Sequence, residues 1–215
     1  MQQKTIPLKD FFRNPERTSF AISPNGKFLS FLAPYEGRLN VFVQEISGGE
    51  PRRLTDVTER DIAKYLWGND RTILYIKDNA GDENFHLYSV FTDGSGSKDL
   101  TPFNGVRANI VDELEDHESE ILIELNKRNP EFFDVYRLNI ETGEMKMAAE
   151  NPGNVSGWGT DHKGIIRIAL TTDGVNNGIM YRDSEADEFK TIITTNFREM
   201  LAPLFFTFDD KNIYA

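Results

Sequence analysis

The sequence predicts an all-β fold, an incomplete β-propeller of four-stranded antiparallel blades. Three observations support this prediction. Short apolar segments recur with a period of roughly 45 residues, turn-forming residues separate them at matching places, and an aromatic residue keeps its place in the third segment. These aromatic residues are Phe42, Tyr88, Tyr136 and Tyr181. Such a period with four strands per repeat is typical of propeller blades, whereas a β-sandwich, the main rival, requires no fixed period.

The first repeat shows the pattern most clearly. Its predicted strands cover 18–22, 28–32, 40–44 and 51–55, and the turn Ser23-Pro24-Asn25-Gly26-Lys27 joins the first two. Proline holds φ near the value that a turn needs, and Asn-Gly tolerates positive φ. The predicted repeats are 18–60, 61–105, 106–152, 153–200 and the opening of a fifth at 201–215.

Residues 1–17 precede this pattern. We expect a lead-in segment with one helical turn that docks Phe11 and Phe12 on a surface that the sequence does not identify. At the other end, a fifth repeat begins with a strand at 204–208 and a turn at 209–211. A propeller removes its sheet edges by closing into a ring. We therefore expect a fragment of a longer protein, whose open arc pairs with another copy or ends frayed.

Composition excludes several classes of function. The 35 acidic and 24 basic residues give a net charge of −11, which argues against nucleic-acid binding. The chain has no cysteine, so disulfides and thiolate metal sites are excluded. No apolar run reaches the length of a membrane span. Residues Met1 to Thr5 contain no apolar h-region, so no signal peptide is expected in this chain. The compartment stays open: cytoplasmic, or periplasmic or secreted if a signal peptide was removed.

The lengths of the loops predict which end of each blade carries a binding surface. In antiparallel blades, the loops between strands two and three share one face with the connections from strand four to the next blade. The opposite face has short turns that turn geometry explains, such as Gly68-Asn69-Asp70. The first face has longer loops, among them 34–38 and 126–130, and such loops carry binding on rigid scaffolds.

Charged residues gather in these longer loops. We expect Arg38, Arg60, Glu83, Arg107 and Arg128 to meet a partner domain or a substrate, with Glu59 and Arg198 nearby. Glu83 and Arg107 are the favoured residues for a substrate cavity, on loop position alone. The competing interpretation is that charges in long loops are simply solvated.

Other chemistry finds little support. The loop 78–84 lacks the ligand order and closing glutamate of an EF-hand. His86, His117 and His162 fall in different repeats without metal-ligand spacing, so no metal or other cofactor is predicted. Gly94-Ser95-Gly96 precedes no helix pattern and reads as a hairpin turn. The sequence holds no Gly-x-Ser-x-Gly motif, and no catalytic residues are predicted.

Several ordered stretches resemble one known family. Ile22 to Lys27 is similar to the Ser-Pro-Asp-Gly-Lys motif of propellers in the prolyl oligopeptidase family and in TolB-like proteins. More specific stretches are 38–43, 52–55, 81–88, 99–103, 134–138 and 149–153. Together they resemble the N-terminal propeller of prolyl oligopeptidase family (S9) serine peptidases, in the acylaminoacyl-peptidase-like branch.

The resemblance implies a two-domain enzyme. Its N-terminal propeller would limit entry to short peptides, and a C-terminal α/β-hydrolase domain, absent from this chain, would carry serine, aspartate and histidine. The alternative is a TolB-like or other non-enzymatic propeller that binds protein partners. A propeller enzyme with its site in a central channel is the least favoured, because histidines and carboxylates do not cluster.

Overall fold

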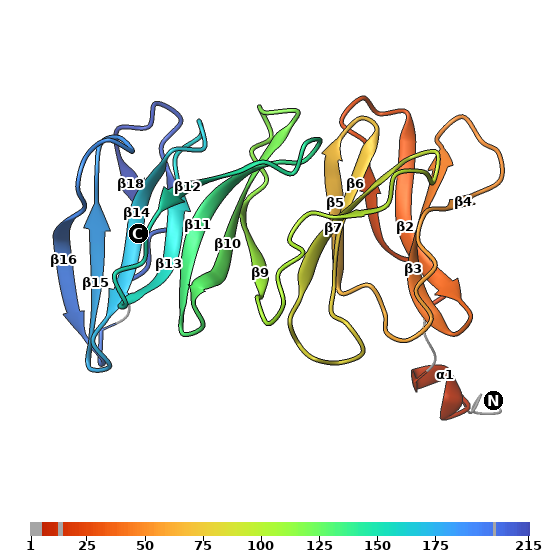
Figure 1. Ribbon diagram of the computed structural model, residues 1–215, viewed down its shortest axis with the longest axis horizontal. Coiled ribbons are helices and arrows are strands. Elements are labelled where there is room, and N and C mark those ends of the chain that lie inside the picture. The colour runs from red at the N-terminus through yellow and green to blue at the C-terminus, as the bar shows by residue number, and fades with distance from the viewer. Residues whose placement is uncertain (1–5, 13–14, 200) are drawn as a thin grey trace, which may run out of the picture. The chain divides into compact units, whose positions relative to one another are not determined.

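The computed structural model describes residues 6–12, 15–199 and 201–215. Residues 1–5, 13 and 14 of the predicted lead-in segment, and residue 200, lie outside the described residues. The described chain consists of strands and one short helix, α1 (Lys9–Phe12), which cannot span a bilayer (Figure 1). It divides into two compact units, 1–83 with 87–99 and 84–86 with 100–215, and each unit is described by itself.

Two four-stranded sheets form the first unit. Their strands follow chain order and pair antiparallel. The strands are β1 (Thr18–Ile22), β2 (Phe28–Tyr35), β3 (Arg38–Glu45), β4 (Arg52–Arg53), β5 (Lys64–Asn69), β6 (Thr72–Lys77), β7 (His86–Phe91) and β8 (Lys98–Asp99). This confirms the predicted blade architecture, in which four consecutive strands form one sheet.

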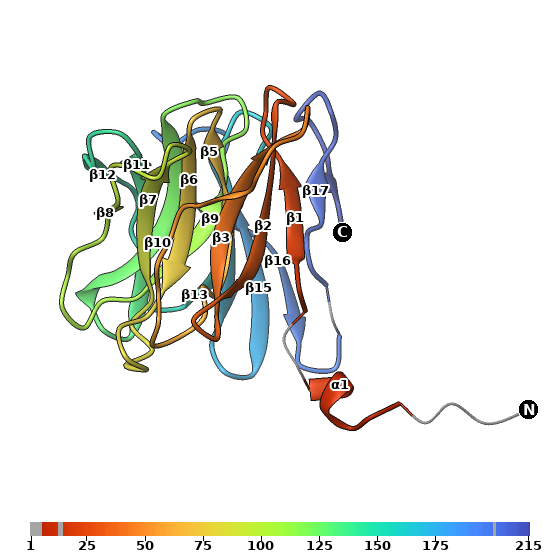
Figure 2. The same ribbon diagram turned by 90° about the vertical axis from the view of Figure 1, so that its right-hand side faces the viewer.

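Side chains of both sheets share one core in this unit. Leu32, Val41 and Val43 pack with Ile73 and Tyr75, and all five are buried. Helix α1 adds nothing to this core. Phe11 and Phe12 are 66% and 80% exposed, and Figure 2 shows α1 beyond the end of β1, apart from the sheet. Neither ring therefore docks on the described residues, and the surface that would receive them stays a prediction.

The loop predicted at 34–38 is wrong as well. Strand β2 runs through Tyr35, which pairs with Arg38 at the start of β3, so the connection is the two-residue turn Glu36-Gly37. Both turn residues have positive φ, 49° and 80°, as a type I′ hairpin requires. Glutamate is uncommon at positive φ, and the tight turn was therefore missed.

The second unit contains two further four-stranded sheets and a hairpin, again paired antiparallel in chain order. The strands are β9 (Ala108–Asp112), β10 (Glu120–Asn129), β11 (Phe132–Asn139), β12 (Met145–Ala149), β13 (Val155–Thr160), β14 (Ile166–Thr172), β15 (Asn176–Tyr181), β16 (Lys190–Asn196), β17 (Phe205–Phe206) and β18 (Ile213–Tyr214).

Two boundaries differ from the predicted ones. Residues 126–130 are not a loop, because Asn129 in β10 pairs with Phe132 in β11 and leaves Pro130-Glu131 as the turn. In the first unit, β5 continues to Asn69, which pairs with Thr72, so the predicted turn at 68–70 lies one to two residues further on. In both cases the strands extend into the polar residues that mark turns in sequence.

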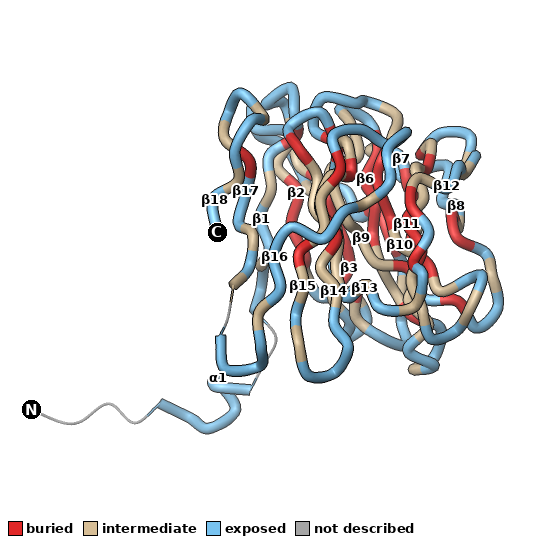
Figure 3. The backbone as a smooth tube through the Cα atoms, turned by 90° about the vertical axis from the view of Figure 1, so that its left-hand side faces the viewer, coloured by how far each residue is buried: buried red, intermediate tan, exposed pale blue. Residues whose placement is uncertain are grey.

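The third-strand aromatic residues keep the predicted register. Phe42 lies opposite Arg53, Tyr136 opposite Met147 and Tyr181 opposite Lys190, each in the fourth strand of its sheet. Burial concentrates in the middle strands, whereas β16 is almost entirely exposed (Figure 3). In the second unit, Leu122, Val135 and Ile166 belong to one core cluster, and Ile168, Ile179 and Phe206 to another.

Candidate functional site

In the first unit, a buried amide ties the β2–β3 hairpin to the connection that follows β4. The Asn40 side chain accepts a hydrogen bond from the Val57 backbone N–H at 2.8 Å and donates one to the Val57 carbonyl at 2.9 Å. Asn40 also accepts from the Thr55 hydroxyl at 2.9 Å. Further along, Asp61 accepts from the Leu39 N–H at 2.7 Å. These contacts place the β2–β3 hairpin and the connection that follows β4 at the same end of the sheet, as predicted.

The same connection carries Arg60 to the β6–β7 loop. Its Nε lies 3.4 Å from Oδ1 of Asp78, whose side chain is only 3% exposed while that of Arg60 is 55% exposed. The guanidinium also covers Gly81, since a Cβ built there would lie 2.8 Å from Arg60 Nη1. A buried carboxylate thus holds the exposed arginine over this loop.

Asp78 also shapes the backbone at Glu83. Its second oxygen accepts from the Glu83 N–H at 3.4 Å, and Glu83 adopts a left-handed φ of 59°. The Glu83 side chain is exposed, and among the described residues nothing pairs with its carboxylate. We call Arg60, Asp78 and Glu83 the Arg60–Glu83 surface. A cavity of about 220 Å³ between 56–60 and 77–80 opens beside Arg60.

Arg38 stands apart from this cluster. It is exposed at the start of β3, opposite Tyr35. The guanidinium of Arg53 lies over the Tyr35 ring, 3.4 Å from the ring centroid. The predicted residues of the first unit therefore fall into one cluster, with Arg60 and Glu83, and one separate hairpin position.

In the second unit, Arg107 lies beside a perturbed carboxylate. Its guanidinium sits 5.3 Å from the Phe85 ring centroid, and its backbone N–H donates to Asn126 at 2.7 Å. Burial raises the pKa of Glu124, while a 3.0 Å hydrogen bond from Asn109 and the charge of Arg107 oppose the increase. Glu124 lies within a strand, and no motif in the sequence singles it out. Perturbed carboxylates are enriched at functional sites.

Arg128 is engaged within its own sheet. It makes two 2.9 Å hydrogen bonds to the fully buried carboxylate of Asp134 and donates to the Asn151 carbonyl at 2.7 Å. The hydrogen bonds to Asp134 raise the pKa of Arg128. Asp134 also accepts from the Asn151 N–H at 2.8 Å. Asp134 precedes its third-strand aromatic by two residues, as Asn40 does, so the two residues tie equivalent connections.

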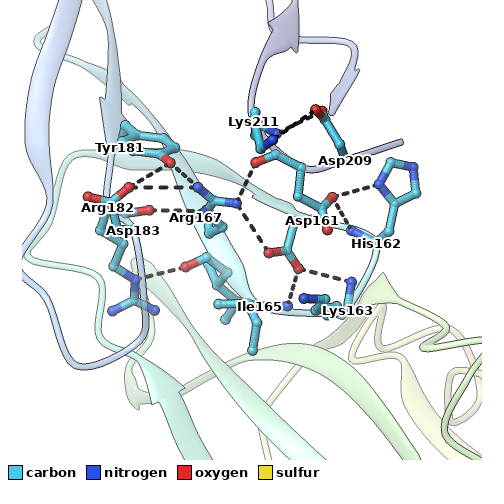
Figure 4. A network of polar contacts seen from close by, with 12 residues as sticks. Asp161, His162, Lys163, Ile165, Arg167, Tyr181, Arg182, Asp183, Asp209 and Lys211 are labelled. Carbon is cyan, nitrogen blue, oxygen red and sulfur yellow. Dashed lines mark hydrogen bonds and ion pairs between the residues drawn. The ribbon is translucent and has the colours of Figure 1, made fainter. Parts of the chain in front are cut away.

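A network of charged residues holds the β13–β14 turn of the second unit (Figure 4). Arg167 donates to Asp161 at 3.4 Å and to the carbonyl of Asp210 at 2.9 Å. Asp161 in turn accepts from the Lys163 N–H at 3.0 Å. His162 Nδ1 lies 2.7 Å from Asp210, and this hydrogen bond lowers the pKa of the Asp210 carboxyl. These contacts join the turn to the β17–β18 hairpin.

Beside this turn lies a larger cavity that the sequence did not predict. It encloses about 530 Å³, and we call it the Trp158 cavity. It lies between the β9–β10 connection, the β13–β14 turn and the start of β17, which contribute Leu114, His117, Lys163 and Phe205. The β9–β10 connection, residues 113–119, is longer than the other turns of its kind, and this length was the available signal. Among the described residues, no group of histidines and carboxylates is arranged to hold a metal ion.

Comparisons with known proteins identify sequence relatives of this chain. No family model matches the chain. Over 207 residues it is 30% identical to dipeptidyl aminopeptidase BIII of Pseudoxanthomonas mexicana, covering 94% of this chain and 30% of that protein. Over 155 residues it is 31% identical to dipeptidyl peptidase family member 6 of Caenorhabditis elegans, covering 68% and 21%. The chain therefore spans less than a third of either relative.

Solved structures show the same fold at low identity. The β-propeller domain of the Trilobed protease from Pyrococcus furiosus matches with a TM-score of 0.54 at 16% identity, over 82% of this chain and 56% of that one. A prolyl endopeptidase gives 0.60 at 10%, over 84% and 30%. TolB from Acinetobacter baumannii gives 0.53 at 16%, over 87% and 45%.

The fold is thus that of a β-propeller of four-stranded blades. With the two sequence relatives, the comparisons confirm the predicted resemblance: this chain is similar in sequence to two dipeptidyl peptidases and shares its fold with the propeller-containing peptidases among the solved structures.

Proposed function

We propose that this chain is the non-catalytic propeller of a serine peptidase that cleaves short peptides, and that it limits their access to a C-terminal α/β-hydrolase domain. The observation that carries the proposal is the 30% identity to a dipeptidyl aminopeptidase over 94% of the chain. A gating role also agrees with a chain that has no Gly-x-Ser-x-Gly nucleophile motif of its own.

The Arg60–Glu83 surface supplies the chemistry for holding a peptide. A dipeptidyl aminopeptidase acts at the amino end of its substrate, and a free amino terminus is a cation that a carboxylate binds through charge-assisted hydrogen bonds. Glu83 offers an exposed carboxylate, and its backbone position is fixed by Asp78. Arg60, held by the same aspartate, offers a donor for peptide carbonyl oxygens.

The other predicted residues divide by their contacts. Arg38 and Arg107 are exposed and are proposed to face the hydrolase domain or the peptide. Arg128 makes its hydrogen bonds to Asp134 and Asn151, so we propose that it positions the end of its blade. Its role would then be to keep the neighbouring connection in place.

The first experiment tests the parent protein. Lysate of the source organism is probed with an antibody to this chain and with a serine-reactive fluorophosphonate. We expect a band far heavier than 24.6 kDa that takes up the probe. A band that never labels would overturn the peptidase proposal in favour of a TolB-like propeller that binds protein partners, the alternative that the TolB fold likeness supports.

The second experiment tests Glu83 in the full-length enzyme. Glu83→Gln should raise KM for a dipeptide substrate with a free amino terminus by about tenfold or more, because a hydrogen bond to a charged group contributes roughly 1.5–3 kcal/mol. Hydrolysis of the same substrate with an acetylated amino terminus should not change. Glu50→Gln, another exposed glutamate of the first unit, is the control. Equal effects of both variants would remove Glu83 from the site.

A further inference from the structure

The Trp158 cavity has the size of a small-molecule site, and part of its wall is apolar. Ligand cavities in proteins usually enclose about 300–1,000 Å³ and have mostly apolar walls with a few polar groups. This one encloses about 530 Å³. Trp158, Leu114, Ile168 and Phe206 contribute apolar surface to it, and the last three are buried.

Contacts with neighbouring residues hold Trp158 and Leu114 of the apolar wall in place. The indole of Trp158 packs against the Phe189 ring with centroids 5.9 Å apart. Leu114 sits against Gly164, and its backbone N–H donates to Asp112 at 2.8 Å. Asp112 also accepts from the Thr160 hydroxyl on β13. The β9–β10 connection is therefore fastened to the strand that carries Trp158.

Negative groups outnumber positive ones in the lining of the cavity. Four carboxylates and one lysine ammonium line it. The two aspartates already described, Asp112 and Asp161, are used by internal hydrogen bonds. Glu115 and Asp116 are exposed, and neither side chain makes an ion pair or hydrogen bond within the described part of the chain. Lys163, in the β13–β14 turn, is the lysine of this lining.

We propose that the Trp158 cavity binds a primary ammonium group carried on an apolar body. Glu115 and Asp116 would face the ammonium group, while Trp158 and Leu114 would cover the apolar part. A tryptophan face attracts cations beside its apolar contact, and the net charge of −11 favours the approach of cations. Two sources share this chemistry: a free aralkylamine and a lysine side chain of a peptide. The site uses none of the residues of the Arg60–Glu83 surface and does not depend on peptidase activity.

The two tryptophans of the chain provide the test. Trp67 lies in the first unit, and its indole N–H is buried without a hydrogen-bond partner in the described structure, so Trp67→Phe removes an unsatisfied donor. In that variant all tryptophan fluorescence reports on Trp158. The probes are phenethylammonium, N-acetyl-lysine amide and, as a control of similar size and opposite charge, phenylacetate. Calorimetry on the unmodified chain repeats each titration without any substitution.

We expect saturable fluorescence changes with phenethylammonium and none with phenylacetate. Binding of N-acetyl-lysine amide would identify a peptide side chain as a source, and its failure would restrict the site to free amines. The double variant Glu115→Gln, Asp116→Asn should weaken binding roughly tenfold, since partly exposed ion pairs contribute modestly. Glu141→Gln with Glu144→Gln, in the β11–β12 turn, should leave it unchanged.

Three results would overturn the proposal. The first is an absence of saturable binding of both ammonium probes in fluorescence and calorimetry. The second is equal binding of phenylacetate, which would mean that the cavity selects only apolar shape. The third is equal weakening by the cavity variant and the turn variant, which would mean that the general charge of the chain attracts the amine.

Discussion

Gly164 provides the sharpest test of how the Trp158 cavity is built. Its φ is +69°, and a Cβ added there would lie 2.1 Å from Leu114 Cδ2. Carbon atoms in contact normally stay about 3.5–4.0 Å apart, so Gly164→Ala must displace Leu114. Gly105 has the same φ of +69° with nothing within 4 Å of the added Cβ, and Gly105→Ala is therefore a matched control for backbone conformation.

The two costs can be separated. Placing alanine in the left-handed region costs about 1–2 kcal/mol, and the loss of freedom in the unfolded chain offsets part of this. We expect Gly105→Ala to lower the free energy of unfolding by about 1 kcal/mol. Gly164→Ala should add an overpacking cost of about 1–3 kcal/mol. In a chain that already carries Leu114→Ala, the two glycine substitutions should cost the same, because the displaced side chain is gone.

Urea unfolding of the Trp67→Phe chain, followed by Trp158 fluorescence, measures these differences in the second unit. Equal costs for Gly164→Ala and Gly105→Ala in the presence of Leu114 would refute the packing argument. An undiminished cost of Gly164→Ala after Leu114→Ala would do the same, since a coupling energy between contacting residues must then be missing.

Three further predictions concern other parts of the chain. Asn40→Ala should lower the free energy of unfolding by about 2–4 kcal/mol in urea denaturation, because it removes the acceptor of the buried Thr55 hydroxyl proton and the side-chain partner of the Val57 N–H and carbonyl; a cost below 0.5 kcal/mol would contradict this. The hydrogen bonds from Asn176 and Val175 lower the pKa of Asp173 to about 2, so the stabilisation by this carboxylate is complete above its unfolded pKa of 3.8 and disappears as the pH falls through 2. Carboxyl NMR titration measures this pKa, and Asn176→Ala should raise it, unlike Asn154→Ala. Ile192, Phe197 and Phe208 are 51%, 71% and 99% exposed, so we propose that the chain self-associates through this end; light scattering should show a concentration-dependent mass that Phe208→Ser lowers, and a constant monomer mass would contradict it.

Much of the candidate site followed from the order of strands. Four-stranded blades bring the loops after strands two and four to one end, and this rule predicted that Arg60 and Glu83 share a surface. Their common partner, Asp78, was not predictable, because nothing local distinguishes an aspartate that becomes buried from one that stays in water. The same holds for Arg128, which reads as a charge in a polar loop and lies in a strand with a buried Asp134 beside it.

By itself, the sequence determined the features that depend on neighbouring residues. These features are the Pro-Asn-Gly turn, the alternation of the strands and the repeated place of Phe42 and Tyr136. Each depends on a few neighbouring residues, so it can be predicted from the sequence alone. Only the tertiary structure decided which distant groups meet. Leu114 rests on Gly164, and Asp112 meets Thr160, at separations of about one blade repeat. Such contacts depend on how sheets pack, and burial, charge pairing and cavities follow from that packing.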